Sequence, residues 1–406
     1  MRICILTTAT TVHQMGGTEV HAETLAAEAA RQGHTVFLVT TAHPDGLETE
    51  RKDGYTIKYL GGTRHTMSRR ESPAWWLASS KQTAKLCETE KIDVVWGENF
   101  SGISYAAIPR ERRRPVISIV QGLAIRGEIA SNFSRVSTPG ELLYFITRYA
   151  AQTLFYYIPR FRAMVQDSDL LVGVSRETAE ALAREFPGSA ARTRVIFNPV
   201  DTDFFRPDPA LRDKTRLQLG LAQGTMAILM SGVVHKQKGM HHGLAAFSGI
   251  AGDFPGTKLL VVGGGPQLED LKTAAAGAGL ADRVIFCGPK KNSEMPAYYN
   301  AADIYLNPTL RLEGLPVVIA EAMACGLPCV VSKTGGTGST LEDGKSGFFV
   351  KPGKTEGFKS RLSELIKDAG LRGRLASEAR TKAVKDFDLK TNLAAYVAAS
   401  REVLKS

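Results

Sequence analysis

The stretch DIYLNPTLRLEGLPVVIAEAMACGLPCVVSK, residues 303–333, decides the fold class. Short apolar segments at 303–308 and 328–333 flank a polar loop and an apolar run that extends from Pro316 to Gly326. Proline is favoured in the first turn of a helix, and glycine is favoured just after the last turn. The stretch therefore predicts strand, loop, helix and strand, which is one βαβ unit of a parallel sheet.

The same rhythm of short apolar strands and helical segments occurs in two series along the chain. Strands are expected at 2–8, 34–40, 92–97, 115–120, 169–175 and 194–200, and then at 226–232, 258–265, 283–288, 303–308 and 328–333. Between the series, residues 198–214 hold three prolines and no apolar periodicity, which is typical of a linker. We expect an α/β protein with two Rossmann-like doubly wound domains, residues 1–197 and 198–386, that face each other across a cleft.

Composition supports a globular protein with more than one core. The chain has 406 residues, of which 43% are hydrophobic and 23% charged, and domains of 100 to 200 residues are usual. No run of 18 apolar residues predicts a membrane span, and the N-terminal apolar stretch is interpreted as a first strand rather than a signal peptide. Five cysteines without a CxxC pair indicate free thiols in a reducing cytoplasm rather than a zinc site: Cys4, Cys87, Cys287, Cys325 and Cys329.

The net charge of +10 invites a nucleic-acid interpretation, but the basic residues do not form one tract and no nucleic-acid-binding motif accompanies them. The segment 145–165 instead mixes Arg148, Arg160 and Arg162 with tyrosines and phenylalanines. Two interpretations stay open for it. It either contacts an anionic membrane at the inner face of the plasma membrane, or it is a partly buried domain helix with a solvated rim.

Three loops in the second half follow expected strands and carry candidate binding residues. Lys238 and Gly239 follow the strand at 226–232, where a lysine at a helix start can neutralise a phosphate, although a solvated loop lysine is the plainer alternative. Three glycines, Gly263, Gly264 and Gly265, allow close backbone approach after the next strand.

The third loop places Glu313 before the helix and Glu321 about one and a half turns inside it. Helix geometry leads us to expect the amides of Leu315, Val317 and Val318 at the helix start, where backbone donors bind anions. An anion at those amides has a carboxylate on either side that can accept bonds from hydroxyl groups. A phosphate flanked by polyols is a nucleotide-sugar, so the loop predicts a nucleotide-sugar site.

The second half resembles the retaining, nucleotide-sugar-dependent glycosyltransferases of family 4, which have the two-domain GT-B fold. The resemblance rests on motifs whose order and spacing match: NPVDTDFFRP at 198–207, KG at 238–239, GGGP at 263–266, the two glutamates 313 and 321, GG at 335–336 and DGKSGFFV at 343–350. The N-terminal GGTEVHAETLAAEAARQGHTV also resembles the family's first glycine loop and helix. The resemblance is loose only between about 45 and 165.

The resemblance implies roles for individual residues. Glu313 faces the hydroxyls of the donor sugar, Glu321 faces the ribose and Lys238 contacts the diphosphate. Gly16 and Gly17 allow acceptor or diphosphate to approach the N-terminal domain, and residues from Cys287 hold the base through backbone groups. The C-terminal helix at 387–406 completes the N-terminal domain.

The implied reaction is transfer, with retention, of a hexose or N-acetylhexosamine from a nucleoside diphosphate, with UDP favoured. The implied acceptor is a glycan, lipid or polyol in bacterial surface polysaccharide, lipopolysaccharide or glycolipid synthesis. No metal cofactor is expected, because Lys238 and the helix dipole can stabilise the departing diphosphate. An epimerase or hydrolase of the same fold, or a non-catalytic nucleotide-sugar-binding subunit, is the alternative.

Three positions depart from the family pattern. Val233 stands where an arginine usually pairs with the lysine, Gln121 stands where a histidine is usual, and Ser339 replaces a usual glutamate. Glutamine can bond to a sugar hydroxyl but cannot carry a proton. Glu98 and Asn99, which follow the strand at 92–97, are further candidates for contact with the acceptor.

Overall fold

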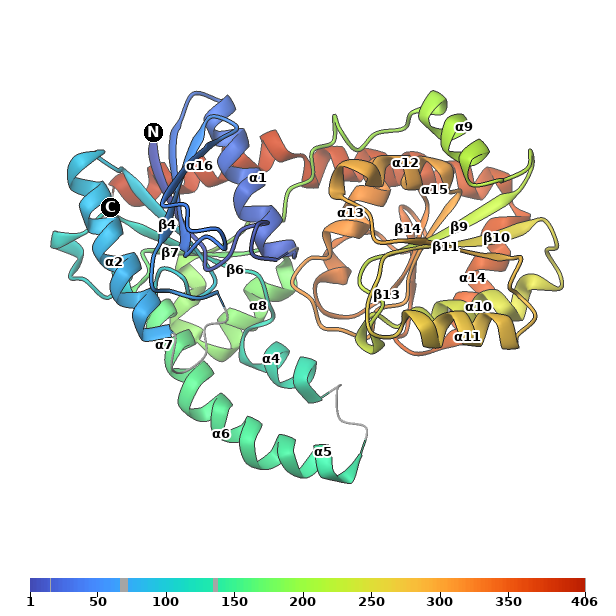
Figure 1. The fold of residues 1–406 in the computed structure, drawn as a ribbon, viewed down its shortest axis with the longest axis horizontal. Helices are drawn as coiled ribbons and strands as arrows, with labels where there is room; N and C mark the ends of the chain where they lie inside the picture. Colours follow the sequence, from blue (N-terminus) through green and yellow to red (C-terminus); the bar gives the residue numbers. More distant parts are fainter. Residues whose placement is uncertain (15, 66–71, 134–137, 406) are drawn as a thin grey trace. The chain divides into compact units, whose positions relative to one another are not determined.

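The computed structural model describes residues 1–14, 16–65, 72–133 and 138–405 (Figure 1). The chain divides into two compact units, one formed by Met1–Pro199 with Leu389–Ser406 and the other by Val200–Asp388. Each boundary lies two residues from the position expected from the sequence. Met15, which belongs to the expected first glycine turn, lies outside the described residues.

Unit 1, as we call the first of these, contains an eight-stranded sheet in the order β3-β4-β2-β1-β5-β6-β7-β8. All neighbouring strands are parallel except β3 and β4, which form an antiparallel pair at one edge. The strands are β1 (Arg2–Leu6), β2 (Thr35–Thr41), β3 (Thr49–Lys52), β4 (Tyr55–Leu60), β5 (Val94–Glu98), β6 (Val116–Val120), β7 (Leu170–Gly173) and β8 (Thr193–Val195).

The central strands of unit 1 consist of apolar residues that are buried on both faces, as expected for a parallel sheet covered by helices. The helices are α1 (Gly17–Arg31), α2 (Ser72–Thr89), α3 (Ile103–Ala106), α4 (Ala124–Phe133), α5 (Pro139–Tyr144), α6 (Ala150–Gln152), α7 (Ile158–Asp167), α8 (Arg176–Glu185) and α16 (Leu389–Lys405). The C-terminal helix α16 is fixed in this unit because Trp96 Nε1 donates to Ser400 Oγ at 2.9 Å, and both groups are buried. Tyr396 of α16 also packs on the ring of Trp96.

Unit 2, as we call the second, contains six parallel strands in the order β11-β10-β9-β12-β13-β14. They are β9 (Met226–Ser231), β10 (Thr257–Val262), β11 (Val284–Gly288), β12 (Ile304–Asn307), β13 (Cys329–Ser332) and β14 (Gly347–Val350). The helices are α9 (Pro209–Gln218), α10 (Met240–Ala251), α11 (Leu268–Gly277), α12 (Met295–Ala301), α13 (Val317–Ala324), α14 (Thr355–Lys367) and α15 (Ala369–Lys382). Aliphatic side chains of β9, β10 and β12 form its core with α10 and α14.

The structure confirms the expected mixture of two parallel sheets and helices, with local differences. Strands β3 and β4 lie in the segment where the sequence resemblance is loose, and they were not expected. The strand expected at 194–200 is only three residues long, and β14 adds an edge strand after β13. A 3₁₀ turn, Gly335–Ser339, follows β13. Strand β3 is short and polar, and β4 alternates buried with half-buried residues, so the apolar pattern that predicts central strands is weak in both.

Candidate functional site

Each sheet has one point at which the strand order reverses, and ligands bind beyond the carboxyl ends of strands at such points. In unit 2 the reversal lies between β9 and β12, and in unit 1 it lies between β1 and β5. The loops that follow these four strands hold most of the residues selected from the sequence.

In unit 2 the loops after β9 and β12 are bonded to each other. The carbonyl of Gln237 accepts hydrogen bonds from Leu310 N at 2.8 Å and from Thr309 Oγ1 at 3.3 Å. Gly239 has φ +65°, and a Cβ there would lie 2.1 Å from the carbonyl oxygen of Pro308. Only glycine permits this close approach, which brings the two loops together at the switch point.

Lys238 and Glu313, 75 residues apart in sequence, form an ion pair between Nζ and Oε1. Their side chains are 25% and 15% exposed, so both charges remain accessible. The two residues selected separately for a diphosphate and for a sugar are therefore each other's partner in this structure. A diphosphate can compete for the lysine, and sugar hydroxyls can compete for the carboxylate.

Helix α13 begins at Val317, one residue later than expected. Pro316 is its N-cap, with ψ 104°, rather than a residue of the first turn. The side chain of Leu315 is buried, whereas Val317 and Val318 are half-buried. The first amides of a helix have no partner within it, so this helix start offers donors in the loop that also carries Glu313.

Glu321 is 8% exposed and accepts a hydrogen bond at Oε2 from the hydroxyl of Tyr299 at 2.8 Å. Ser231 Oγ lies 3.4 Å from that hydroxyl and 3.0 Å from the hydroxyl of Tyr305. Burial raises the pKa of Glu321 to about 7, while the bond from Tyr299 opposes this shift. A small change in pH near neutrality therefore changes the charge of this carboxyl group.

The glycine loop after β10 differs in detail from expectation. Gly263 and Gly265 have φ +143° and +151°, and a Cβ on either would collide with the backbone of the loop after β9. Gly264 has no such constraint, since a Cβ there would meet Pro289 at an ordinary 3.6 Å. Burial raises the pKa of the half-buried Cys287, at the end of β11, to about 11, so its thiol is neutral.

Two of the departures from the family pattern differ in exposure. Val233 is 54% exposed in the loop after β9, so this position has room for a longer side chain. Ser339 is buried at the end of the 3₁₀ turn. The departure from the family pattern at Val233 therefore lies on an accessible surface, whereas the departure at Ser339 lies in the interior of unit 2.

In unit 1, Gly16 is the N-cap of α1 and Gly17 is its first residue. A Cβ at Gly16 would lie 2.4 Å from Oε2 of Glu19, whereas a Cβ at Gly17 would meet nothing within 4 Å. Glu19 also accepts from Gln14 Nε2 at 2.6 Å. A carboxylate of the chain itself therefore lies beside the helix start that was expected to receive an anion or acceptor.

Gln121, which follows β6 and is half-buried, belongs to a chain of hydrogen bonds that extends into the interior of unit 1. Asn198 Nδ2 donates to Gln121 Oε1, Gln121 Nε2 donates to Glu98 Oε2, both at 3.0 Å, and His21 Nδ1 donates to Glu98 Oε1 at 2.6 Å. An ionised carboxylate can only accept, so Glu98 determines which end of the glutamine amide faces it. Asn99, whose φ is +49°, accepts a hydrogen bond at Oδ1 from the backbone amide of Gln121.

The expectation that Glu98 faces an acceptor is wrong, because its side chain is only 1% exposed and both oxygens have partners within unit 1. Sequence reasoning also missed His21 and Asn198 in this chain and Tyr299 beside Glu321. His21 is separated from Glu98 by 77 residues, so no local pattern connects them. The one available signal was a histidine on the apolar side of the first helix.

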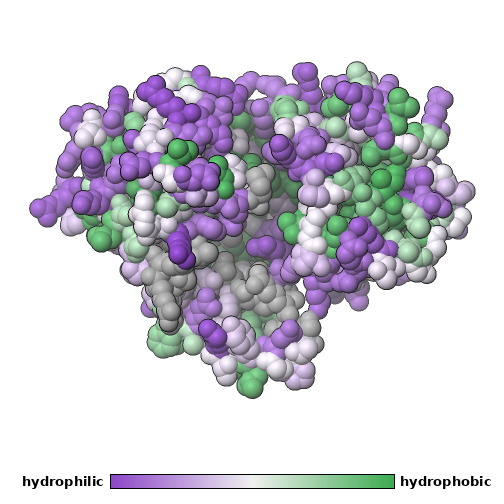
Figure 2. All heavy atoms as spheres, in the orientation of Figure 1, coloured by the Kyte–Doolittle hydropathy of each residue, from purple (hydrophilic) through white to green (hydrophobic). Residues whose placement is uncertain are grey.

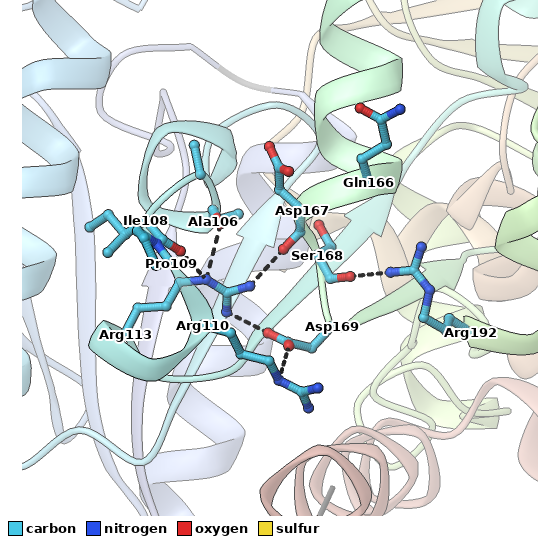
Figure 3. Close-up of a pocket in the computed structure, with 11 residues that line it drawn as sticks. Ala106, Ile108, Pro109, Arg110, Arg113, Gln166, Asp167, Ser168, Asp169 and Arg192 are labelled. Atoms are coloured by element: carbon cyan, nitrogen blue, oxygen red, sulfur yellow. Dashed lines mark hydrogen bonds and ion pairs between the residues drawn. The ribbon is translucent and has the colours of Figure 1, made fainter.

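The open pocket drawn in Figure 3 has a volume of about 340 Å³ and lies at the opposite, amino edge of the sheet in unit 1. Arg113 is held there by the carboxylate of Asp169 and by the carbonyls of Ala106 and Asp167, while Arg110 pairs with the same aspartate (Figure 3). Asp169 also accepts from Val116 N, at the start of β6. These arginines join strand ends, so we interpret the pocket as structural.

In the part of the chain that the structure describes, no cluster of three or more His, Cys, Asp or Glu could hold a metal ion. No helix among residues 1–14, 16–65, 72–133 and 138–405 is long and apolar enough to cross a membrane.

The two units, each with a doubly wound sheet, define an α/β protein of the Rossmann-like class, and two family models match it. Residues 15–204 match the model described as "Glycosyltransferase Family 4", and residues 212–382 match "Glycosyl transferases group 1". The chain belongs to glycosyltransferase family 4.

Curated relatives match part of the chain. A GDP-mannose-dependent alpha-(1-6)-phosphatidylinositol monomannoside mannosyltransferase of Mycolicibacterium smegmatis is 34% identical over 213 residues, which are 51% of this chain and 55% of the relative. A D-inositol 3-phosphate glycosyltransferase of Xylanimonas cellulosilytica is 32% identical over 225 residues, 53% of each chain. The match spans about half the length of these relatives.

Solved structures match over the full length and identify the GT-B fold. HepE of Anabaena, crystallised with UDP, has a TM-score of 0.77 at 19% identity and covers 99% of this chain and 100% of its own. Sucrose-phosphate synthase of Thermosynechococcus elongatus has a TM-score of 0.79 at 19% identity, with 100% and 99% covered. At such low identity, these likenesses establish the fold alone.

Proposed function

We propose that this protein is a retaining glycosyltransferase that moves a hexose from a nucleoside-diphosphate sugar to a hydroxyl group of a glycan or lipid-linked acceptor. The observation that carries this proposal is the accessible Lys238–Glu313 pair, which lies at the switch point of unit 2 in the same loops as the start of α13. Family membership and the names of the relatives support the same class of reaction.

The proposed reaction breaks the bond between the anomeric carbon and the diphosphate and forms a bond from that carbon to the acceptor oxygen. Negative charge develops on the diphosphate, where Lys238 and the first amides of α13 stabilise it. The proton of the acceptor hydroxyl passes to a diphosphate oxygen. Attack on the face that the diphosphate leaves retains the anomeric configuration.

Each glutamate has a binding role in this proposal. When the diphosphate pairs with Lys238, Glu313 loses this partner and accepts hydrogen bonds from hydroxyls of the donor sugar instead. Glu321 accepts from a ribose hydroxyl through Oε1, because Oε2 is bonded to Tyr299. Neither is assigned as a nucleophile, since the charge of Glu313 is paired and Glu321 is buried with a raised pKa.

GDP-mannose is the donor to test first, since the relative with 34% identity is named for it. UDP-sugars are tested second, because UDP is the donor nucleotide that the family resemblance favours. A screen of GDP-, UDP- and ADP-sugars by thermal shift separates them, because a ligand at 100 times its dissociation constant adds roughly 2.7 kcal/mol of stability. If no nucleotide-sugar shifts the melting temperature, the proposed donor site is contradicted.

For the acceptor, the phosphatidylinositol mannoside in the name of one relative supports a glycolipid or surface-polysaccharide pathway. We place the protein in the cytoplasm at the inner face of the plasma membrane, in contact with anionic lipid. An epimerase or hydrolase of the same fold releases epimer or free sugar without acceptor, and a non-catalytic binding subunit binds donor without turnover.

The test of the mechanism is Lys238→Ala, assayed for transfer with the donor found in the screen. We expect turnover to fall about 100-fold or more, because one preorganised charge at the leaving group is lost. Lys272→Ala is the matched control, since Lys272 pairs with Glu269 on the exposed surface of the same unit. Unchanged turnover in Lys238→Ala would contradict the role of the lysine.

A further inference from the structure

The segment from α4 to α7 forms an arm of helices at the edge of unit 1 (Figure 1). From Pro139 to Asp167 the backbone is helical throughout, with π-helical segments at Phe145–Tyr149 and Thr153–Tyr157. The ring of Phe133 at the end of α4 meets that of Phe145 at 5.2 Å. The two helical parts of the arm therefore pack against each other at its far end.

One side of this long helix is anchored in unit 1. Phe161, Met164 and Val165 belong to a buried cluster with residues of β6, β7 and α8. Arg160 lies between the rings of Trp76 and Tyr156, at 4.5 and 3.1 Å from their centres, and donates to Ser72. These contacts attach the C-terminal part of the long helix to unit 1.

The part of the arm between 129 and 155 carries many exposed apolar side chains. Eight of the seventeen large hydrophobic side chains with strong exposure among the described residues lie between 129 and 155. They are Ile129, Phe133, Leu142, Leu143, Tyr144, Ile146, Leu154 and Phe155, and Phe155 is 68% exposed. We call these eight side chains the arm face. A monomeric protein rarely gathers so many exposed apolar groups in one place without a partner.

Positive charge accompanies the arm face. Between 139 and 166 the sequence has three arginines, Arg148, Arg160 and Arg162, and a single acid, Glu141. Glu141 is engaged in the capping box at the helix start with Thr138. Arg148 lies 5.4 Å from the centre of the exposed Tyr144 ring, and Arg162 is exposed. At the lower edge of Figure 2, green and white surface alternates with purple over the arm.

We infer that the arm face docks on an anionic lipid bilayer, with its apolar side chains at the boundary of headgroups and acyl chains and with Arg148 and Arg162 on lipid phosphates. Tyrosine suits this boundary because its ring is apolar and its hydroxyl can reach water. Arginine is suited to bidentate contact with phosphate. The inference names the surface for the membrane contact in the proposed function, but it does not depend on glycosyl transfer.

The arm face fits a bilayer better than a second copy of this chain. A second copy would bring the same arginines to a self-complementary contact, where like charges repel. A bilayer rich in acidic lipids supplies negative charge across its whole surface and attracts basic residues within about one Debye length. A bilayer and a second copy of the chain predict different results in the same set of experiments.

The test is flotation of the full chain with vesicles of phosphatidylcholine alone and of phosphatidylcholine mixed with phosphatidylglycerol. We expect binding only to the mixed vesicles, and loss of most of it at about 1 M salt, where the Debye length is about 3 Å. The double variant Leu143→Ser with Phe155→Ser should reduce the bound fraction roughly tenfold or more, because both side chains leave the boundary region. Leu77→Ser, on α2 and 75% exposed, is the matched control and should bind as the wild type does.

Charge-reversal variants test whether the positive charge of the arm contributes to vesicle binding. Arg148→Glu should weaken binding to the mixed vesicles by about tenfold, while Lys81→Glu on α2 should not. Circular dichroism should show that all variants keep the wild-type melting temperature, since the changed side chains are exposed.

Equal binding of wild type and double variant would overturn the inference, and so would binding independent of phosphatidylglycerol. A dimer in sedimentation that the double variant converts to monomer, without any vesicle binding, would assign the face to a second copy instead. Vesicle binding without transfer of any sugar would leave the arm face supported while contradicting the proposed enzyme, so the two failures are distinguishable.

Discussion

The carboxyl edges of the two sheets each carry a glutamate bonded to a nitrogen of a basic residue, but in opposite environments. In unit 2 the Lys238–Glu313 pair is partly exposed, with side chains 25% and 15% accessible. In unit 1 the His21–Glu98 pair is 1% exposed at both residues and continues through Gln121 to Asn198. An accessible pair can exchange its partner for a ligand, whereas a buried pair fixes the position of its neighbours. We therefore expect the pair in unit 2 to be able to exchange its partner, and the pair in unit 1 to hold its neighbours in place.

The comparison predicts unequal losses of stability when one partner is removed. His21→Ala should lower the free energy of unfolding by about 3 to 5 kcal/mol, because it leaves one oxygen of the buried Glu98 carboxyl group without a donor. Lys238→Ala should cost no more than about 1 kcal/mol, since its pair is partly solvated. Urea unfolding of the two variants measures both. Equal losses would refute the contrast between the two edges.

A second prediction concerns the buried carboxyl group of unit 2. The pKa of Glu321 is raised to about 7, so between about pH 4.5 and 7 the folded state binds more protons than the unfolded state. Stability from this group is therefore present below that window and is lost as the pH rises through it.

Glu321→Gln retains an acceptor for Tyr299 but does not titrate. At pH 8 the variant should be more stable than the wild type by roughly 2 to 3 kcal/mol, and it should lack this part of the pH dependence. Melting temperatures from pH 4 to 8 provide the measurement. Parallel curves for both proteins would show that Glu321 titrates normally.

The contact between the loops after β9 and β12 can be tested with two glycines of nearly equal conformation. Gly239 has φ +65° and Gly220 has φ +64°, but only a Cβ at Gly239 meets another atom, the carbonyl oxygen of Pro308. Gly220→Ala should cost about 1 kcal/mol for its backbone conformation alone. Gly239→Ala should cost about 1 kcal/mol more and weaken donor binding, as measured by unfolding and by thermal shift with the donor. If the two variants behave alike, the close approach is unimportant.

The smallest expected effect is a gain. Val233→Arg places a cation on the exposed loop after β9, at the position where the family has arginine, and should tighten donor binding about fivefold to tenfold. Val195→Arg, on an exposed site of β8, is the control and should leave affinity unchanged. Isothermal titration with the donor compares them. Weaker binding in Val233→Arg would mean that this loop approaches no phosphate.

The sequence predicted the central strands well because they are short apolar runs between helical segments. It did not predict β3 and β14, which lie at sheet edges, or β4, which lies beside β3. For the site, Glu313 and Glu321 follow from one continuous motif, whereas Glu98 was placed correctly at a strand end but assigned to the surface. Whether a residue at a strand end is exposed depends on the helices that cover it. Helix α1 brings His21 against Glu98 and so covers its carboxyl group.

The sequence by itself determined the two parallel sheets, the helix that starts after Pro316 and the glycines that allow close turns, because these depend on local spacing and backbone freedom. Only the tertiary structure decided which side chains meet. Lys238 meets Glu313 because the strand order places β9 beside β12, and Tyr299 meets Glu321 in the interior of unit 2. Burial then raises the pKa of Glu321, since the cost of removing a carboxylate from water depends on every group packed around it.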